Sequence, residues 1–216
     1  MFNVCPGCGQ YSVEKQIDPD GPAAICPFCG HRHPFRRLPL FVVTGASGAG
    51  KTTVALALPE QLPECVTLET DILWRPEFNK PDDDYHEFRE TWLRLAKNVS
   101  QNGRPVVLCG TAAPGQFERC AEARYFSAIH CLALVCDDDV LVRRLRARPA
   151  WRQAGDEAFV ERMLSFNAWL KARADAGEVP AFQMSLLDTT CVDPSETVER
   201  VVGWVRACAS ERNSLP

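Results

Sequence analysis

From residue 38 onward, short apolar runs alternate with longer stretches in which apolar residues recur every three or four positions. Several of the runs are apolar throughout, which is typical of strands that are covered on both faces. These runs predict five strands, at residues 40–44, 65–69, 105–109, 129–136 and 182–187.

Helical periods separate the predicted strands. Apolar side chains at steps of three and four predict helices that include residues 85–99, 159–170 and 198–205. Asp84 and Glu87 have the spacing of a capping box at the start of the first of these helices. Because strands and helices alternate, we expect an α/β fold with a parallel, doubly wound sheet.

Composition and charge agree with this class. The 216 residues are 46% hydrophobic and 24% charged, as in a globular protein with one domain and a small appendage. The longest apolar stretch, residues 128–136, is too short to span a bilayer, and the first residues lack a signal-peptide pattern. The net charge of −4 argues against a surface built to coat nucleic acid or an anionic membrane. We therefore expect a cytoplasmic protein with no membrane partner.

The 11 cysteines fall into two groups. Cys5 and Cys8 form one C-x-x-C pair, Cys26 and Cys29 form another, and 17 residues separate the pairs. This spacing predicts a zinc site, and four thiolate ligands would close it against water, as in a structural centre. A redox dithiol or disulfide pair is the alternative. The other seven cysteines have no motif spacing, so we expect small apolar side chains in a reducing compartment.

The segment that holds the two pairs, residues 1–35, resembles a zinc ribbon. Residues 1–33 contain too few apolar side chains for a core, so metal binding must supply most of the folding free energy, about 10 kcal/mol. Two roles remain open: a structural cap, or a recognition tip that uses the basic cluster after the second pair. That cluster consists of His31, Arg32, His33, Arg36 and Arg37.

A glycine-rich loop, GASGAGKT at residues 45–52, directly follows the first strand of the main domain, which we assign to residues 38–216. Its backbone N–H groups can converge on a phosphate chain, and the next helix points its positive end at the same anion. We expect Lys51 to reach the β- and γ-phosphates of ATP and Thr52 to hold Mg²⁺. The expected nucleotide-binding residues are Gly45, Ala46, Ser47, Gly48, Ala49, Gly50, Lys51, Thr52 and Thr53.

Two acids, Glu69 and Asp71, lie at the end of the second predicted strand. The carboxyl edge of such a strand faces the crevice where ligands bind, so we expect Asp71 to accept an acceptor's proton or to orient Mg²⁺ through water. A helix cap or a surface acid is the alternative, and Glu69 is the weaker candidate. The third strand ends in CGT at residues 109–111, without a Walker B acid. That absence argues against a motor-type ATPase but not against a small kinase.

An arginine-rich segment follows the fourth predicted strand, at residues 143–152. It predicts a mobile lid that excludes water and neutralises the transferring phosphoryl group, with Arg148 and Arg152 as catalytic residues. A solvated basic helix face is the alternative. The acceptor should bind between the second strand and the 85–99 helix. The expected substrate contacts are Asp71, Trp74, Arg75 and Arg89.

The combination of a phosphate loop, an acid after strand two, an aromatic-rich helical insert and an arginine-rich segment resembles the adenylate-kinase-like P-loop kinases. The segments LETDILW, LCGTAAP and RLRARPAWR are similar to bacterial nucleoside or nucleotide kinase-like proteins. This resemblance covers residues 38–209. It implies a three-layer sandwich with a five-stranded parallel sheet in the order 2-3-1-4-5, and a loop at 188–193 that flanks adenine. One departure is that the Asp-Gly-x-x-x-Arg signature of nucleoside monophosphate kinases is absent at residues 109–111.

We expect an Mg-ATP-dependent phosphotransferase that acts on a hydroxyl of a small molecule, with a nucleoside or nucleotide as the favoured acceptor. One alternative is a polynucleotide 5′-hydroxyl kinase, or a nucleic-acid-binding ATPase, that uses the ribbon to grip a strand. The acidic net charge disfavours it. A third interpretation is an ATP-binding adaptor with slow hydrolysis. The expected cofactors are ATP, Mg²⁺ and Zn²⁺.

Overall fold

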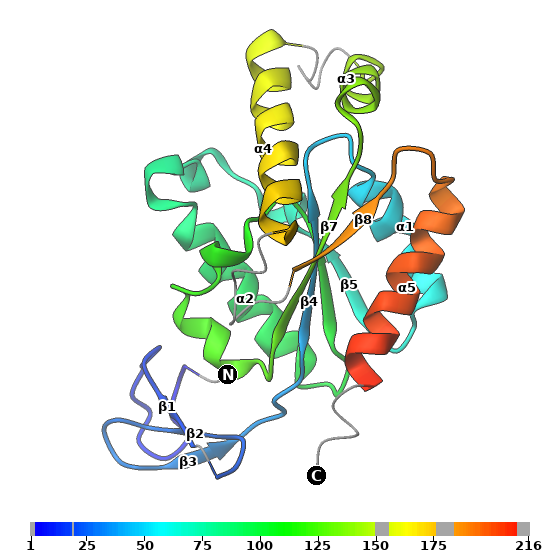
Figure 1. The fold of residues 1–216 in the computed structure, drawn as a ribbon. Coiled ribbons are helices and arrows are strands. Elements are labelled where there is room, and N and C mark those ends of the chain that lie inside the picture. Colours follow the sequence, from blue (N-terminus) through cyan, green and yellow to red (C-terminus); the bar gives the residue numbers. More distant parts are fainter. Residues whose placement is uncertain (1–2, 19, 150–155, 176–183, 211–216) are drawn as a thin grey trace.

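A computed structural model of the chain describes residues 3–18, 20–149, 156–175 and 184–210, which form two sheets (Figure 1). The smaller, antiparallel sheet lies within the cysteine-rich segment. Its order is β1 (Gln16–Ile17), β2 (Ala23–Ile25) and β3 (Arg32–Pro34), with Ala24 paired to His33. Such short strands bury little surface, which agrees with a fold that relies on a metal.

The larger sheet has five strands, and every neighbouring pair in it is parallel. These strands are β4 (Leu40–Gly45), β5 (Val66–Glu69), β6 (Val106–Cys109), β7 (Ile129–Val135) and β8 (Met184–Asp188). Their spatial order, β5-β6-β4-β7-β8, confirms the predicted α/β class and the order 2-3-1-4-5. Residues 182–183 of the fifth predicted strand lie outside the described residues.

Helices cover both faces of this sheet and make the three-layer sandwich (Figure 1). Helices α1 and α5 pack on one face, whereas α2 and α4 pack on the other, and α3 packs on α4. Their bounds are α1 (Lys51–Gln61), α2 (His86–Ser100), α3 (Asp138–Arg146), α4 (Glu157–Asp175) and α5 (Pro194–Ser210). Short 3₁₀ turns lie between β5 and α2 and between β6 and β7: η1 (Thr70–Leu73), η2 (Pro76–Phe78), η3 (Pro81–Asp83), η4 (Pro114–Gln116) and η5 (Ala121–Tyr125). None of the described helices has the length and apolar character to cross a membrane.

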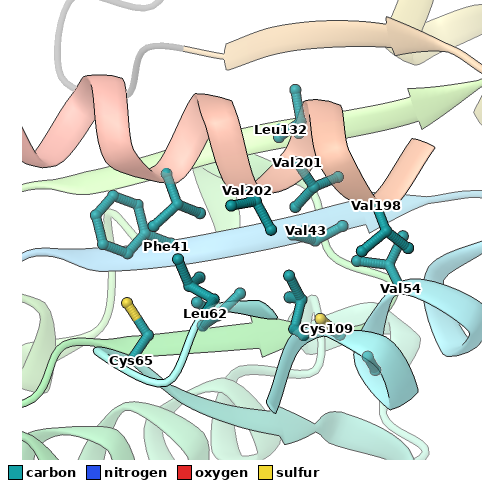
Figure 2. Close-up of a cluster of buried hydrophobic side chains, with 14 of the residues drawn as sticks. Phe41, Val43, Val54, Leu62, Cys65, Cys109, Leu132, Val198, Val201 and Val202 are labelled. Atoms are coloured by element: carbon teal, nitrogen blue, oxygen red, sulfur yellow. The ribbon is translucent and has the colours of Figure 1, made fainter. Parts of the chain in front are cut away.

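The central strand β4 is buried on both faces, as its unbroken apolar sequence predicts. Phe41 and Val43 point into the cluster under α1 and α5, which Figure 2 shows. Leu40 and Val42 point into the opposite cluster, under α2. Fully burying one such side chain contributes about 1.5–3 kcal/mol, so this strand is a rigid base for the loop that follows it.

The predicted capping box at the start of α2 is wrong. Asp84 and Tyr85 both have left-handed backbone conformations, with φ of 49° and 58°, and the helix has no side-chain cap. A capping residue needs extended φ and ψ, so the carboxylates bind elsewhere. Glu87 pairs with Lys80 at 2.7 Å and Asp84 pairs with Arg119 at 2.7 Å.

The cysteine-rich segment is anchored to the far end of α2. Lys97, on α2, and Glu122, on η5, form a buried ion pair of 2.5 Å, with each side chain 1% exposed. Lys97 also donates to the side chain of Asn3 at 3.1 Å, and Arg124 donates to the Val13 carbonyl. The segment therefore docks at the opposite end of β4 from the glycine-rich loop (Figure 1).

Candidate active site

The glycine-rich loop wraps tightly between β4 and α1. Gly45 has φ of 145°, and a Cβ at this position would lie 2.4 Å from the Leu134 carbonyl oxygen, so only glycine fits. Gly50 has φ of 110° and begins α1 without any side-chain cap. The first N–H groups of α1 therefore lack a capping side chain, which leaves a positive helix end at the loop.

Lys51 folds back across this loop. Its ammonium donates to the carbonyl oxygens of Gly45 at 2.8 Å and Ala46 at 3.0 Å. Burial lowers the pKa of Lys51 to about 8, although the nearby Asp71 carboxylate acts in the opposite direction. A bound phosphate that accepted hydrogen bonds from Lys51 would favour the protonated, positively charged ammonium, as the loop motif predicts.

Glu69, the acid that ends β5, contacts the phosphate loop directly, although the sequence favoured Asp71 over it. Its Oε1 atom accepts a 2.7 Å hydrogen bond from the hydroxyl of Thr52. Asp71 lies two residues on, in η1, and is exposed. A hydroxyl in contact with one carboxylate, with a second carboxylate two residues along the chain, offers hard oxygen donors of the kind that Mg²⁺ prefers. The spacing Glu-x-Asp at the end of this strand was the signal for such a pair.

A cavity of about 750 Å³ opens beside the loop, between η1 and α2. This acceptor cavity brings together four of the predicted catalytic and substrate residues, Asp71, Trp74, Arg89 and Arg148. Loop, hydroxyl and aromatic side chains complete its lining, notably Ser47, Thr70, Asn79, Tyr85, Phe88, Thr111 and Phe159. Arg75 is exposed and is not among the lining residues. Arg152, the second predicted lid residue, lies outside the described part of the chain.

A second cavity, of about 240 Å³, follows the loop on its other side. Its walls include residues 48–54, Arg144, Arg148, Thr189 and Pro194. Arg148 lines both cavities and so marks their junction.

Arg144 is held in this second cavity by Thr189, through bonds to its hydroxyl at 3.0 Å and its carbonyl at 2.8 Å. In the sequence, Arg144 is one of several arginines in the predicted lid segment. Nothing in the periodicity of α3 points to Thr189, which lies 45 residues away.

Close packing shapes the end of the third strand of the main sheet. A Cβ on Gly110 would lie 1.7 Å from the Thr70 hydroxyl, so β6 runs directly against η1. The next residues are fixed by Thr44, whose hydroxyl donates to the Ala112 carbonyl at 2.6 Å and accepts from the Ala112 N–H at 2.9 Å. Burial raises the pKa of the Cys109 thiol to about 12, which makes it inert as a nucleophile.

The four N-terminal cysteines converge on one point. Their sulfur atoms all lie within 4.8 Å of one another, with Cys5–Cys29 at 3.7 Å and Cys8–Cys26 at 3.8 Å. Four sulfurs at about 2.3 Å from one zinc ion would lie about 3.8 Å apart in a regular tetrahedron. A disulfide would bring two of them to about 2 Å. The cluster therefore fits the metal centre of a zinc ribbon.

Comparisons with known proteins agree with this geometry. A family model described as an AAA domain (AAA_33) matches residues 40–172. A sugar kinase from Janibacter sp. HTCC2649 has a TM-score of 0.61 at 17% identity, covering 81% of this chain and 98% of that one. A gluconokinase from Sinorhizobium meliloti 1021 has a TM-score of 0.57 at 22% identity, covering 82% and 98%. At these identities the likeness shows the P-loop kinase fold. Among curated proteins, none matches by sequence.

Proposed function

The chain belongs to this AAA-domain family, and from that premise we propose that it is an Mg-ATP-dependent phosphotransferase that phosphorylates a hydroxyl of a small molecule. The observation that carries the proposal is the pair of cavities on either side of the phosphate loop, which share Arg148. A kinase needs such an arrangement, because it must hold two substrates in line while excluding water.

In this proposal the phosphate loop binds the triphosphate of ATP. Its N–H groups and Lys51 take the β- and γ-phosphates, and Thr52 with Glu69 provides oxygen ligands for Mg²⁺, directly or through water. Bound Mg²⁺ supplies positive charge that offsets the charge developing on the phosphates. Arg148, at the junction of the cavities, offsets the charge that remains. Arg152 is predicted to offset the same charge.

Asp71 is the group that we assign to the acceptor. It lies at the edge of the acceptor cavity, two residues beyond the acid that contacts Thr52. The two carboxylates thereby have different roles: Glu69 serves the metal, and Asp71 accepts the proton of the attacking hydroxyl. The acceptor then lies against Trp74 and the aromatic side chains of α2, which suit either a planar base or the apolar face of a sugar ring.

The cysteine-rich segment serves as a closed structural zinc centre in this proposal. All four cysteines bind the ion and leave no position for water, so the centre folds residues 1–35 rather than taking part in the chemistry. The remainder, residues 38–216, is the kinase domain. We propose that the protein works in the cytoplasm, where its seven other cysteines stay reduced.

The test is ADP release from Mg-ATP with a panel of nucleosides, nucleotides, sugars, sugar acids and 5′-hydroxyl oligonucleotides. The variant Lys51→Ala should lower acceptor-dependent ADP formation by about 10³-fold or more, because it removes the cation on the transferring phosphate. Lys80→Ala, which removes an exposed lysine in a surface ion pair, is the matched control. Equal rates in the Lys51→Ala variant and the parent would refute the proposed site.

A further inference from the structure

Helix α2 carries a buried cation in the acceptor cavity. Arg89 is 6% exposed, and its guanidinium donates to the Gln116 side-chain oxygen at 3.1 Å and the Thr111 carbonyl at 2.9 Å. Both acceptors are neutral. Across the described residues, no carboxylate lies within ion-pair distance of Arg89.

A buried guanidinium with no carboxylate in contact is costly, because burial removes its hydration. The Asp84 carboxylate attracts Arg89 only from beyond ion-pair distance and is itself paired with Arg119. The rings of Tyr85 and Phe88, at 5.9 and 5.4 Å from the guanidinium carbon, offer only weak cation–π attraction. Lys97, eight residues further along the same helix, shows the usual solution, a buried carboxylate partner. Arg89 instead resembles Lys51, whose ammonium also donates to carbonyl oxygens and is proposed to bind a phosphate.

The structural alternative is that Arg89 holds the turn at residues 111–117 in place. That turn already has bonds of its own: the Ala113 N–H donates to the Gln116 side chain at 3.0 Å, and the Gln116 N–H donates to the Ala113 carbonyl at 3.0 Å. The bonds from Arg89 use Nε and Nη2, and Nη1 has no partner among the described residues. Arg89 thus lines the cavity and keeps N–H donors available, and the forked geometry of a guanidinium matches a carboxylate or a phosphate.

We infer that the phosphate acceptor is itself an anion: a small hydroxylated compound whose carboxylate or phosphate monoester binds Arg89 while its hydroxyl meets Asp71. This inference rests on the proposed function and narrows it. The aromatic side chains that line the same cavity, Trp74 and Phe88 among them, pack against the carbon skeleton of the acceptor. The acceptor cavity thus recognises the two ends of its substrate by opposite charges.

Matched pairs of acceptors test the inference in the parent protein. D-gluconate is compared with D-glucose for a carboxylate, and CMP with cytidine for a phosphate monoester, by ADP release and product mass. We expect the anionic member of at least one pair to have a kcat/KM about 100-fold higher than its neutral partner. A higher kcat/KM for gluconate than for glucose would indicate a carboxylate acceptor, and a higher kcat/KM for CMP than for cytidine would indicate a phosphate acceptor. Equal use of charged and neutral members would overturn the inference.

Variants then assign the preference to Arg89. Arg89→Gln should raise the KM for the anionic acceptor about 100-fold and change the KM for ATP less than twofold. In Arg89→Lys, the KM for the anionic acceptor should lie between the values of the parent and of Arg89→Gln. Arg119→Gln removes an exposed arginine from the neighbouring surface and is the charge-matched control. A purely structural arginine predicts a different result, in which Arg89→Gln lowers turnover of anionic and neutral acceptors by the same factor.

Binding without turnover separates this inference from the proposed function. The protein is saturated with a non-hydrolysable ATP analogue and Mg²⁺, so that the phosphate loop is filled, and gluconate, glucose, CMP and cytidine are titrated by calorimetry. Selective binding of an anion that is lost in Arg89→Gln and partly kept in Arg89→Lys supports the inference, even if no ADP forms and the phosphotransfer proposal fails. Binding of neutral members alone, or of no anion, overturns it.

Discussion

The two ends of helix α2 treat a buried cation in opposite ways. At the ribbon end, Lys97 is 1% exposed and has a carboxylate at 2.5 Å. At the cavity end, Arg89 is 6% exposed and has only neutral acceptors. The difference shows that the two buried cations of α2 have different roles in this fold. The completed pair lies within the main domain, where Lys97 also contacts the ribbon through Asn3, whereas Arg89, with no carboxylate in contact, leaves a position for a charged ligand.

Removal of metal is the largest perturbation of the ribbon end. A strong chelator should unfold residues 1–35, because metal binding supplies about 10 kcal/mol of their folding free energy. ATP affinity should change less than twofold, since the phosphate loop lies at the opposite end of β4. Metal analysis should find one zinc ion per chain. Limited proteolysis should cut residues 1–35 only after the chelator has removed that ion. A metal-free preparation whose ribbon resists protease equally well would contradict the zinc assignment.

Asp71→Asn is the corresponding perturbation of the cavity end. Removing the proton acceptor should lower kcat by about 10³-fold, which is about 4 kcal/mol, while ATP affinity stays within twofold. Single-turnover kinetics and nucleotide titration measure the two effects separately. The variant Glu69→Gln is the informative comparison, because it should weaken Mg²⁺ dependence instead. If Asp71→Asn phosphorylates as fast as the parent, Asp71 is not the acceptor's base.

Glu122→Gln breaks the completed pair. It should lower the free energy of unfolding by about 3 kcal/mol, because the buried Lys97 ammonium then loses the Glu122 carboxylate. The double variant Lys97→Met with Glu122→Leu should recover much of that loss, since neither charge remains buried. Urea titration gives both values. A single variant as stable as the parent would mean that this buried pair does not stabilise the fold.

The smallest effect concerns Lys51, which, like Arg89, donates its hydrogen bonds to neutral groups. Burial lowers its pKa to about 8, and only its protonated form attracts phosphate. Between pH 7 and pH 9 the free protein loses this proton, so the dissociation constant of Mg-ATP should rise about tenfold, or about 1.4 kcal/mol. Calorimetry in buffers of different ionisation enthalpy should show proton uptake on binding near pH 8. Constant affinity across this range would contradict the lowered pKa.

Much of the fold was predictable from the sequence, because its signals are local. The apolar runs predict all five main strands to within about two residues, since strands covered by helices on both faces favour apolar side chains. The glycine-rich loop and the two cysteine pairs were predictable for the same reason, because their chemistry fixes spacing along the chain.

The parts that escaped prediction depend on contacts between distant residues. The link between Arg144 and Thr189 spans 45 positions, and the ion pair of Lys97 with Glu122 spans 25. The left-handed backbone at Asp84 and Tyr85 overrides a capping pattern that is correct by spacing alone. Whether Arg89 or Arg75 lines the acceptor cavity also depends on how α2 packs, which periodicity does not specify.

The most direct test of the account is the acceptor dependence of ADP formation by the full-length protein, with the mass of the product measured. The account predicts that ADP accumulates only when an acceptor with a hydroxyl and an anionic group is present, and that this acceptor gains one phosphate. Slow ADP release at one rate with or without every acceptor, accompanied by inorganic phosphate alone, would contradict it.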